Sequence, residues 1–283
     1  MIFRTGDKRR VRAELRGRLE RGALLSTGQN AEDVVLLRLF GNQGHGKYLE
    51  IGSAHPTRNS ISFGLYLAGW DGICVDALDV YQEEHEKIRP RDVRLTGVVN
   101  PRNHAVSFLQ TRNPNQSTAS PRLVELYSAT GDGLRLHEIP AIDLNQTLVN
   151  LDFPTDFEVL IIDVEGMELS VLKSIDLRIF HPTCICIETT LPPILWTDPA
   201  LLETQRGSVA DLLGPFGYRE WFFDGVNSYF LSIENCEKFG TLAYPASFYD
   251  DFIPWKVLAV SGLSRSATRY KQTSARSDRE EVP

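Results

Sequence analysis

Short apolar runs alternate with amphipathic stretches along the chain from Lys47 onward. This alternation is typical of βαβ units, in which parallel strands are joined by helices. The apolar runs predict strands at Lys47–Gly52, Gly72–Ala77, Val93–Val99, Glu158–Val164 and Thr183–Glu188. Helical periods predict helices at Asn59–Trp70, Val80–Ile88, Gly166–Leu177 and Asp198–Leu213. The pattern therefore predicts an α/β fold with a doubly wound, mostly parallel sheet.

Two further segments modify this arrangement. Tyr218–Phe223 and Ser228–Ser232 flank the turn sequence Asp224–Asn227, which predicts a C-terminal antiparallel hairpin. Residues 100–135 are rich in Asn, Thr, Ser and Pro, and they predict a loop-like insertion with one helix at Pro121–Ser128. Long irregular segments of this kind are often binding loops or lids.

The 283 residues suffice for one large domain, which we place at residues 23–262. Residues 1–22 form a basic leader that we expect to be a solvated helix and dispensable for folding, and residues 263–283 a disordered polar tail. No apolar run approaches the roughly 20 residues that a membrane span needs. The first residues do not resemble a secretory signal, so we expect a cytoplasmic protein.

Charge and cysteine usage narrow the function classes. The net charge is −7, and the leader holds eight basic residues against three acidic ones, so the remainder of the chain is strongly acidic. An acidic body argues against nucleic-acid binding. Cys74, Cys184 and Cys186 lie in apolar runs and are expected to be reduced core residues, because a cysteine-based metal site would need a second close pair.

Ligands of open parallel sheets bind outside the carboxyl ends of the strands. The first such end is Glu50-Ile51-Gly52-Ser53-Ala54-His55, where Gly52 allows close approach of a ligand to the backbone. A pyrophosphate cofactor would need G-x-G-x-x-G, so the single glycine disfavours an NAD-dependent oxidoreductase. A tight turn explains one glycine equally well.

Asp76 ends the second predicted strand, 24 residues after Gly52. A carboxylate at this place can accept hydrogen bonds from both ribose hydroxyls of an adenosine cofactor. The alternative is a residue that caps the following helix.

Asp163 and Glu165 follow a fully apolar strand, and Glu188 ends the next one. Acids at such positions are costly unless they are solvated, paired or bound to a ligand. Helix capping explains one of the first two acids better than both. We therefore treat all three as candidate site residues.

In these motifs the chain resembles the FkbM-type methyltransferases over most of Gly28 to Pro254. The resemblance is carried by Gly28-Gln29-Asn30-Ala31-Glu32-Asp33, Tyr48–Pro56, Gly69–Ile73, Ile162–Glu168, Ile187-Glu188 and Phe223–Asn227. The chain departs from the family pattern in having Gly28 for serine, Glu50 for aspartate, and Asp76-Ala77 for Glu-Pro.

The resemblance implies a Rossmann-like class I fold and an S-adenosylmethionine-dependent O-methyltransferase. The acceptor would be a hydroxyl of a sugar, glycolipid or polyketide-type molecule. The residues implied in cofactor binding are Gln29, Glu32, Asp33, Glu50, Gly52, Ser53, Asp76 and Asp163.

Methylation of an alcohol needs a base or a metal, because the hydroxyl is a poor nucleophile until its proton leaves. His55 is one candidate base, with Asp163 and Glu165 as further catalytic residues. The other arrangement has Asp163, Glu165 and Glu188 holding Mg²⁺, and we favour the metal-free arrangement. The rival from another class is a cofactor-binding or partner-binding module without catalysis.

Overall fold

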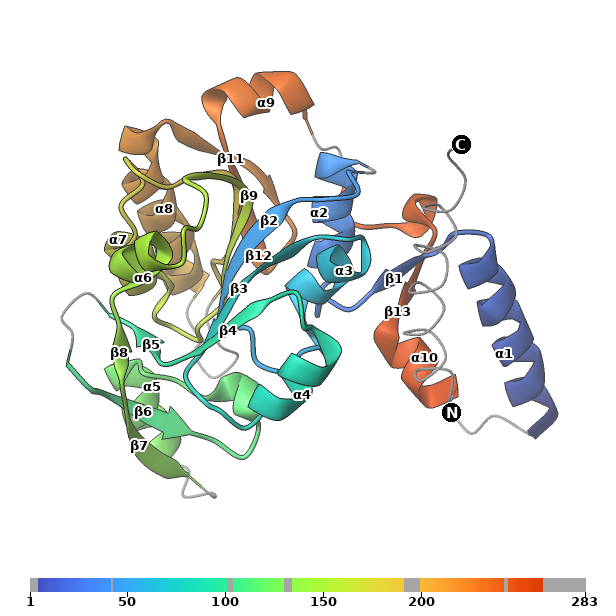
Figure 1. Cartoon of the computed structure of the whole chain (residues 1–283), viewed down its shortest axis with the longest axis horizontal. Helices are drawn as coiled ribbons and strands as arrows, with labels where there is room; N and C mark the ends of the chain where they lie inside the picture. The colour runs from blue at the N-terminus through green and yellow to red at the C-terminus, as the bar shows by residue number, and fades with distance from the viewer. Residues whose placement is uncertain are drawn as a thin grey trace. The chain divides into compact units, whose positions relative to one another are not determined.

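The computed structural model describes residues 5–41, 43–100, 104–129, 134–190, 199–241 and 244–261 (Figure 1). The predicted tail at 263–283 lies outside these residues. The fold divides into two compact units. We call residues 1–42, 57–68 and 244–283 the small unit, and residues 43–56 and 69–243 the sheet unit. Within the described residues, none of the helices combines the length and the apolar character that crossing a membrane requires.

A seven-stranded sheet forms the centre of the sheet unit, in the order β11-β12-β10-β9-β2-β3-β4. Strands β4, β3, β2, β9 and β10 pair parallel with one another, whereas β12 pairs antiparallel with both β10 and β11. The predicted α/β class with a mostly parallel sheet is confirmed. The strands are β2 (Lys47–Ile51), β3 (Asp71–Asp76), β4 (Val93–Thr96), β9 (Asp156–Ile162), β10 (His181–Glu188), β11 (Tyr218–Phe223) and β12 (Asn227–Ser232).

The order of the strands reverses between β2 and β9. The chain runs from β2 outward to β3 and β4, and it then returns to place β9 on the other side of β2. Ile51 at the end of β2 is in register with Val75 on β3 and with Ile162 on β9. The carboxyl ends of these three strands therefore meet at one edge of the sheet.

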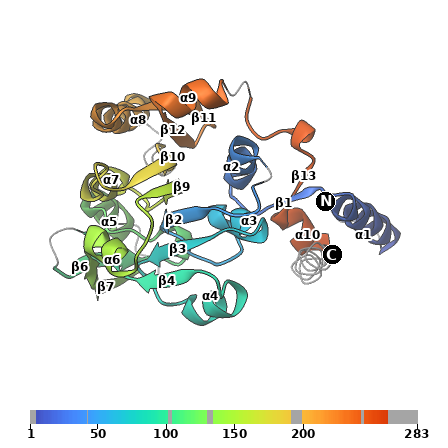
Figure 2. The same cartoon turned by 45° about the horizontal axis from the view of Figure 1, so that its top comes forward.

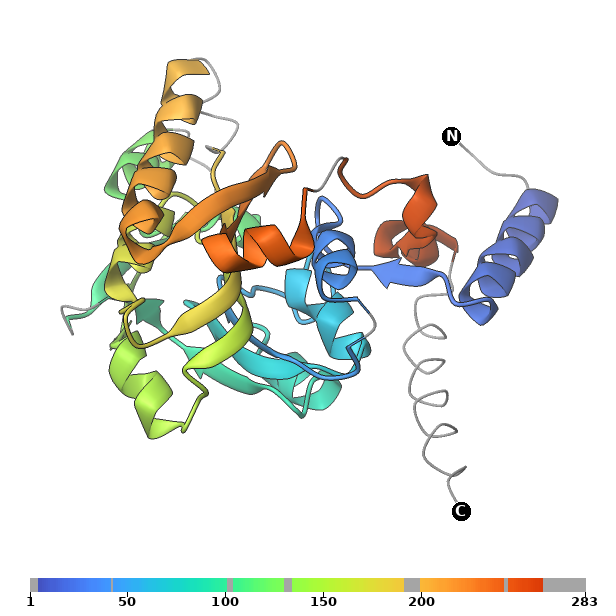
Figure 3. The ribbon, with the colours of Figure 1, turned by 90° about the horizontal axis from the view of Figure 1, so that it is seen from above.

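One face of the sheet is packed by α6 (Leu144–Asn150), α7 (Glu168–Ser174) and α8 (Pro199–Leu213), which Figure 2 shows beside the strands. Leu49 and Ile73 belong to the apolar core between these helices and the strands. Figure 3 shows α8, in gold, beside β11. A short η3 turn (Gly214–Phe216) ends α8 and leads into β11, and α9 (Ile233–Phe239) follows β12.

The opposite face carries polar as well as apolar side chains. Tyr48 and Cys74 alternate with the core residues of their strands and therefore point to this face. α4 (Gln82–Ile88) and the residue after it contribute His85 and Arg89, which are both buried. Arg89 donates hydrogen bonds to the Tyr48 hydroxyl at 2.9 Å and to Cys74 Sγ at 3.3 Å.

The predicted strand Val93–Val99 is two strands in the structure. β4 ends at Thr96, and β5 (Val98–Val99) leaves the main sheet to pair with β8 (Ala141–Ile142). The break lies at Gly97, where an added Cβ would come within 2.9 Å of the Pro140 carbonyl oxygen. The segment 140–142 thus approaches Gly97 so closely that only glycine fits.

The insertion at 100–135 contains α5 (Pro121–Ser128), as predicted. The loop-like interpretation is wrong for its ends, because β6 (Val106–Gln110) pairs antiparallel with β7 (Arg135–Ile139). A short η1 turn (Pro114–Gln116) precedes α5. β6 and β7 contain few alternating apolar residues, so the sequence pattern did not distinguish these strands from the polar residues around them.

The small unit has its own apolar cluster, in which Leu15 is buried with Ile253 and Leu258. Arg18 also forms a salt bridge with Asp251 at 2.6 Å. The leader is helical as expected, but one of its side chains belongs to a core, so it is not merely solvated. The elements of this unit are α1 (Thr5–Glu20), β1 (Leu24–Ser26), α2 (Glu32–Phe40), α3 (Ile61–Leu67), η4 (Phe248–Asp250), β13 (Phe252–Pro254) and α10 (Trp255–Ser261).

Candidate functional site

The junction after β2 is closed tightly around Gly52. The Gly52 amide donates to the Val75 carbonyl oxygen at 2.9 Å, and the Asp163 amide donates to the Ile51 carbonyl oxygen at 3.0 Å. Gly52 has a φ of 95°, and an added Cβ would lie 1.6 Å from the Asp163 carbonyl oxygen. A side chain at position 52 would therefore clash with the backbone of Asp163 and push the ends of β2 and β9 apart.

Asp76, at the end of β3, holds the backbone of two loops. Its Oδ2 accepts from the Ala54 amide at 2.7 Å, and its Oδ1 accepts from the Leu78 amide at 2.9 Å. α4 begins only at Gln82, after Tyr81, so Asp76 does not cap that helix. Each carboxylate oxygen has two acceptor positions, so both oxygens keep capacity for a ligand.

Arg94 on β4 is a residue of this site that the sequence did not reveal. Its side chain is only 2% exposed, and its Nη2 lies 3.7 Å from Asp76 Oδ1. It also donates hydrogen bonds to the Ser53 hydroxyl and, at 3.1 Å, to the Leu78 carbonyl oxygen. Arg94 thus connects Ser53 to the carboxylate that ends β3.

Asp163 and Glu188 form a hydrogen-bonded carboxyl pair across β9 and β10. Burial, and then the nearby Glu50, raise the pKa of Asp163 to about 6, although the hydrogen bond from Glu188 acts in the opposite sense. Burial and the surrounding carboxylates raise the pKa of Glu188 well above its ordinary value. A hydrogen bond between two carboxyl groups requires a proton on one of them, and burial favours the protonated form of Glu188.

Glu165 and Glu168 extend this cluster. Burial, followed by the charges of Asp163 and Glu168, raises the pKa of Glu165 to about 9. Glu165 has a φ of 53°, and its carbonyl oxygen accepts a hydrogen bond from Thr118 Oγ1 at 2.6 Å. The strained backbone at Glu165 is thus held by the insertion.

Glu168 was not among the predicted site residues, and it explains what part of the cluster does for the fold. It accepts hydrogen bonds from the amides of Val164 and Gly166 at 3.2 and 2.9 Å. Burial raises its pKa to about 7, while these amides lower it. α7 has Met167 at its N-cap and no side-chain capping bond, so the helix-capping role considered for Asp163 or Glu165 is not seen, and Glu168 instead holds the turn before the helix.

The insertion also brings Tyr127 to the carboxylates. Burial raises the pKa of Tyr127 from its ordinary value, and the charges of Glu165 and Glu188 raise it further. Tyr127 on α5 is thus close enough to Glu165 and Glu188 for their charges to act on its phenol. No sequence motif marks Tyr127, because its place in the site depends on how the insertion folds.

His55 and Glu50 lie on the side of the sheet that faces α4. His55 is buried, with its Nε2 3.5 Å from Glu84 Oε2 and its ring centroid 4.9 Å from that of Tyr81. Glu50 is buried 4.0 Å from Arg89 Nη1. The contacts described for His55 are thus with Tyr81 and Glu84, whereas the charge of Glu50 contributes to the raised pKa of Asp163.

The opening motif lies in the small unit. Gln29 is exposed, whereas Glu32 and Asp33 are buried. Asp33 accepts hydrogen bonds from Ser26 Oγ at 2.8 Å and from the Thr27 amide at 2.6 Å, and burial raises its pKa. These contacts hold the turn before α2, and the cofactor roles of Gln29, Glu32 and Asp33 stay predictions.

The residues of the alternative Mg²⁺ arrangement do not appear as a compact metal-ligand group among the described residues. In the described part of the chain, one set of at least three His, Cys, Asp or Glu side chains brings its ligand atoms within 4.8 Å of one another. That set is Cys74, His85 and Asp92. Asp163, Glu165 and Glu188 do not belong to that set.

Residues 60–219 match the family model of the methyltransferase FkbM domain. The match includes Asp76, Asp163, Glu165 and Glu188, whereas Glu50, Gly52 and His55 precede it. No curated protein sequence matches the chain. The matched segment covers more than half of the sequence, and it spans β3, β4, β9 and β10 of the sheet described above. The chain therefore belongs to the FkbM methyltransferase family.

Proposed function

We propose that the protein is an S-adenosylmethionine-dependent O-methyltransferase that acts on a hydroxyl of a sugar, glycolipid or polyketide-type molecule. The observation that carries the proposal is the meeting of Gly52, Asp76 and the Asp163–Glu188 pair at one edge of the sheet. The family match is consistent with it, because a methyltransferase needs a methyl donor.

The sheet order supports a doubly wound, Rossmann-like arrangement with the ligand at its switch point. The order reverses between β2 and β9, and in such sheets the ligand binds outside the carboxyl ends of the strands on either side of the reversal. Gly52 follows β2 and Asp163 follows β9. Both lie where the rule places the cofactor.

The residues at this edge fit an adenosine cofactor without phosphates. Asp76 has acceptor capacity for the two ribose hydroxyls. The backbone at Gly52 comes close to Asp163, and the loop holds one glycine instead of the three that a pyrophosphate requires. Ser53 directly follows Gly52 in the chain, and its hydroxyl accepts a hydrogen bond from Arg94.

The carboxyl cluster fits the positive charge of the cofactor. The charged groups that raise the pKa values of Asp163, Glu165 and Glu188 are other carboxylates. A cation placed among them relieves this repulsion and replaces protons that the empty cluster retains. We assign the cofactor's ammonium group to this cluster.

S-adenosylmethionine, when bound, supplies an electrophilic methyl group on a sulfonium. The chain must then position an acceptor hydroxyl in line and take its proton as the new oxygen–carbon bond forms. Asp163 suits this step, because a carboxyl with a pKa of about 6 is largely ionised at neutral pH and is more basic than an ordinary aspartate. We assign to Tyr127 the orientation of the acceptor oxygen, because its phenol is within reach of the charges of Glu165 and Glu188. His55 is the less favoured base, because its contacts are with α4.

The test compares two aspartates on the same strand. Asp163 follows the carboxyl end of β9, whereas Asp156 lies exposed at its amino end. With methyl-labelled S-adenosylmethionine and a panel of methyl glycosides and macrolide polyols, Asp163→Asn should lose at least 100-fold in kcat/KM, in the range of a lost general base. Asp156→Asn should match the wild type.

Equal activity of the two variants would remove Asp163 from the mechanism. An Asp163→Asn protein with wild-type turnover and a much lower Tm would show a purely structural carboxylate. Failure of every acceptor together with absent cofactor binding would favour a non-catalytic binding module.

A further inference from the structure

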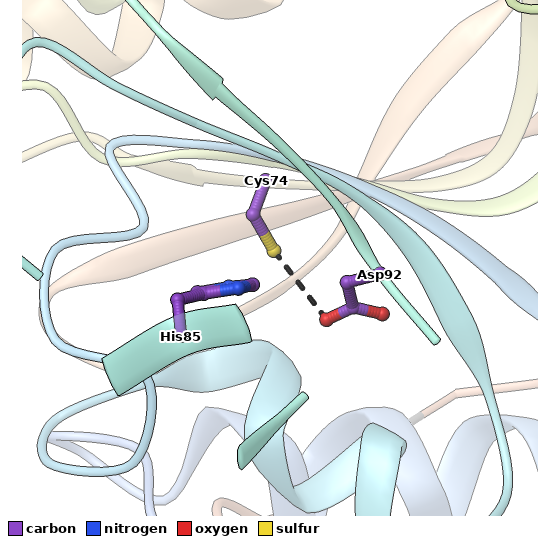
Figure 4. A group of neighbouring side chains, drawn as sticks. All are labelled: Cys74, His85 and Asp92. Carbon is purple, nitrogen blue, oxygen red and sulfur yellow. Dashed lines mark hydrogen bonds between the residues drawn. The ribbon is translucent and has the colours of Figure 1, made fainter. Parts of the chain in front are cut away.

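Cys74, His85 and Asp92 form a buried side-chain group beneath the end of β3 (Figure 4). They come from β3, from α4 and from the turn before β4, and their ligand atoms all lie within 4.8 Å of one another. Cys74 Sγ lies 3.8 Å from Asp92 Oδ2. Ligand atoms around a tetrahedral zinc ion are about 3.2–3.8 Å apart, so a small closing movement would complete such a geometry.

The environment of His85 indicates that a ligand binds within this group. It is 1% exposed, and neither of its ring nitrogens has a hydrogen-bond partner among the described residues. Buried polar atoms are nearly always paired, and an unpaired one commonly marks a bound water or ion. Figure 4 shows the imidazole ring directed toward Cys74. Burial keeps this imidazole neutral, which is the form that binds metals.

We propose that Cys74 Sγ, a ring nitrogen of His85 and Asp92 Oδ2 bind a borderline divalent metal ion of the Zn²⁺ class. A thiolate with an imidazole selects Zn²⁺ over Mg²⁺ or Ca²⁺, which prefer oxygen ligands. Glu50 Oε2, 3.7 Å from Cys74 Sγ, supplies a fourth ligand from β2. On coordination the Cys74 thiol loses its proton to solvent.

Arg89 would support these ligands rather than replace the ion. Its Nε donates to Asp92 Oδ2 at 2.6 Å, and its Nη2 lies 3.3 Å from Cys74 Sγ. Donors to the ligand atoms are a regular part of metal sites, because they orient the ligands. The three anionic ligands Cys74, Asp92 and Glu50 balance the charges of Arg89 and a divalent ion, so the buried assembly is neutral.

The proposed ion would join β2, β3, α4 and the start of β4. Glu50 lies two residues before Gly52, and Cys74 lies two residues before Asp76. Gly52 and Asp76 are both residues of the proposed cofactor site. The ion is thus a structural element beneath the proposed cofactor site and takes no part in methyl transfer. Its presence is measurable without any assay of activity.

The first experiment uses the full-length wild-type protein. It is dialysed against a chelator, incubated with one equivalent of Zn²⁺ or Co²⁺, and passed over a desalting column. We expect one metal ion per chain by elemental analysis, and for Co²⁺ an intense near-ultraviolet thiolate-to-metal absorption. A protein that retains no metal and shows no such band overturns the proposal and leaves a buried water as the partner of His85.

Paired variants assign the ligands. Cys74→Ala and Cys184→Ala each remove a buried thiol from the same sheet, but only the former should lose the thiolate band and the bound metal. Equal metal content in the two variants would show adventitious binding elsewhere and would contradict the assignment.

The His85→Leu variant distinguishes a metal-binding histidine from an unpaired buried histidine by the direction in which Tm changes. If His85 binds metal, the variant should lose the ion and melt at least 5 °C below the zinc-loaded wild type. If His85 is only an unpaired buried histidine, leucine removes two unsatisfied polar atoms, and Tm should stay unchanged or rise. The second result would contradict the proposal even if Cys74→Ala fails to fold.

Discussion

Ala54 donates its backbone amide hydrogen to Asp76 Oδ2 over 2.7 Å, which ties the loop after β2 to the end of β3. The same carboxylate holds the Leu78 amide through its other oxygen. One side chain therefore sets the relative positions of both backbone segments that would surround an adenosine. Removal of Asp76 should therefore weaken cofactor binding both by the lost ribose contacts and by the loosening of these two segments.

Asp76→Ala should weaken S-adenosylhomocysteine binding by about 1–3 kcal/mol, the cost of losing charged hydrogen bonds. Calorimetric titration measures the change, which corresponds to roughly 5-fold to 150-fold in Kd. Asp79→Ala is the matched control, since Asp79 lies three residues away and is exposed. Equal affinities for the two variants would remove Asp76 from the cofactor site.

The carboxyl cluster should make the unliganded protein less stable as pH rises. The pKa values of Asp163, Glu168 and Glu165 are raised to about 6, 7 and 9, so the folded chain binds protons that the unfolded chain has lost. The free energy of unfolding should therefore fall between about pH 4.5 and pH 9. A pKa difference of one between the two states is worth about 1.4 kcal/mol.

Glu165→Gln should reduce this loss, because glutamine cannot ionise. Thermal melts at pH 6.5 and pH 9 measure it, and the exposed Glu125→Gln serves as the control. His85 acts in the opposite sense, since burial lowers its pKa to about 3 and stability falls as pH drops from 6.5 toward that value. A wild-type melting temperature that rises from pH 6.5 to pH 9 would contradict the cluster's protonation.

Leu15→Ala should destabilise the protein by about 2–3 kcal/mol, the lower part of the range for buried leucines, because its cluster is small. Val11→Ala on the same helix is the control, since Val11 is exposed. Denaturant unfolding of the full chain measures both. Indistinguishable midpoints would restore the view that the leader is a solvated helix without a structural role.

Local pattern predicted the strands that carry the site, because their apolar runs end at the polar residues that leave the sheet. It did not predict where α7 begins. The pattern extended this helix back to Gly166, but Glu165 and Gly166 have φ values of 53° and 94°, which no helix adopts. That turn is held by Glu168 and Thr118, and the second of these is a contact from the distant insertion.

The residues that sequence reasoning missed are those whose role depends on long-range packing. Arg94 lies on an edge strand and Tyr127 in the insertion, and neither belongs to a recognisable motif. Cys74 was correctly expected to be buried. The sequence argument excluded a metal site because it looked only for pairs of cysteines. A mixed set of Cys, His and Asp leaves no spacing signature until α4 is placed on the sheet.

Calorimetric titration of the full-length protein with S-adenosylhomocysteine, and separately with NAD, tests the central claim most directly. We predict one S-adenosylhomocysteine per chain with a micromolar Kd, about −7 to −8 kcal/mol, and no heat of binding for NAD. Binding should release protons at pH 7.5, seen as a dependence of the measured heat on the buffer's ionisation enthalpy. Saturable NAD binding without S-adenosylhomocysteine binding would contradict the assignment of this site to a methyl donor.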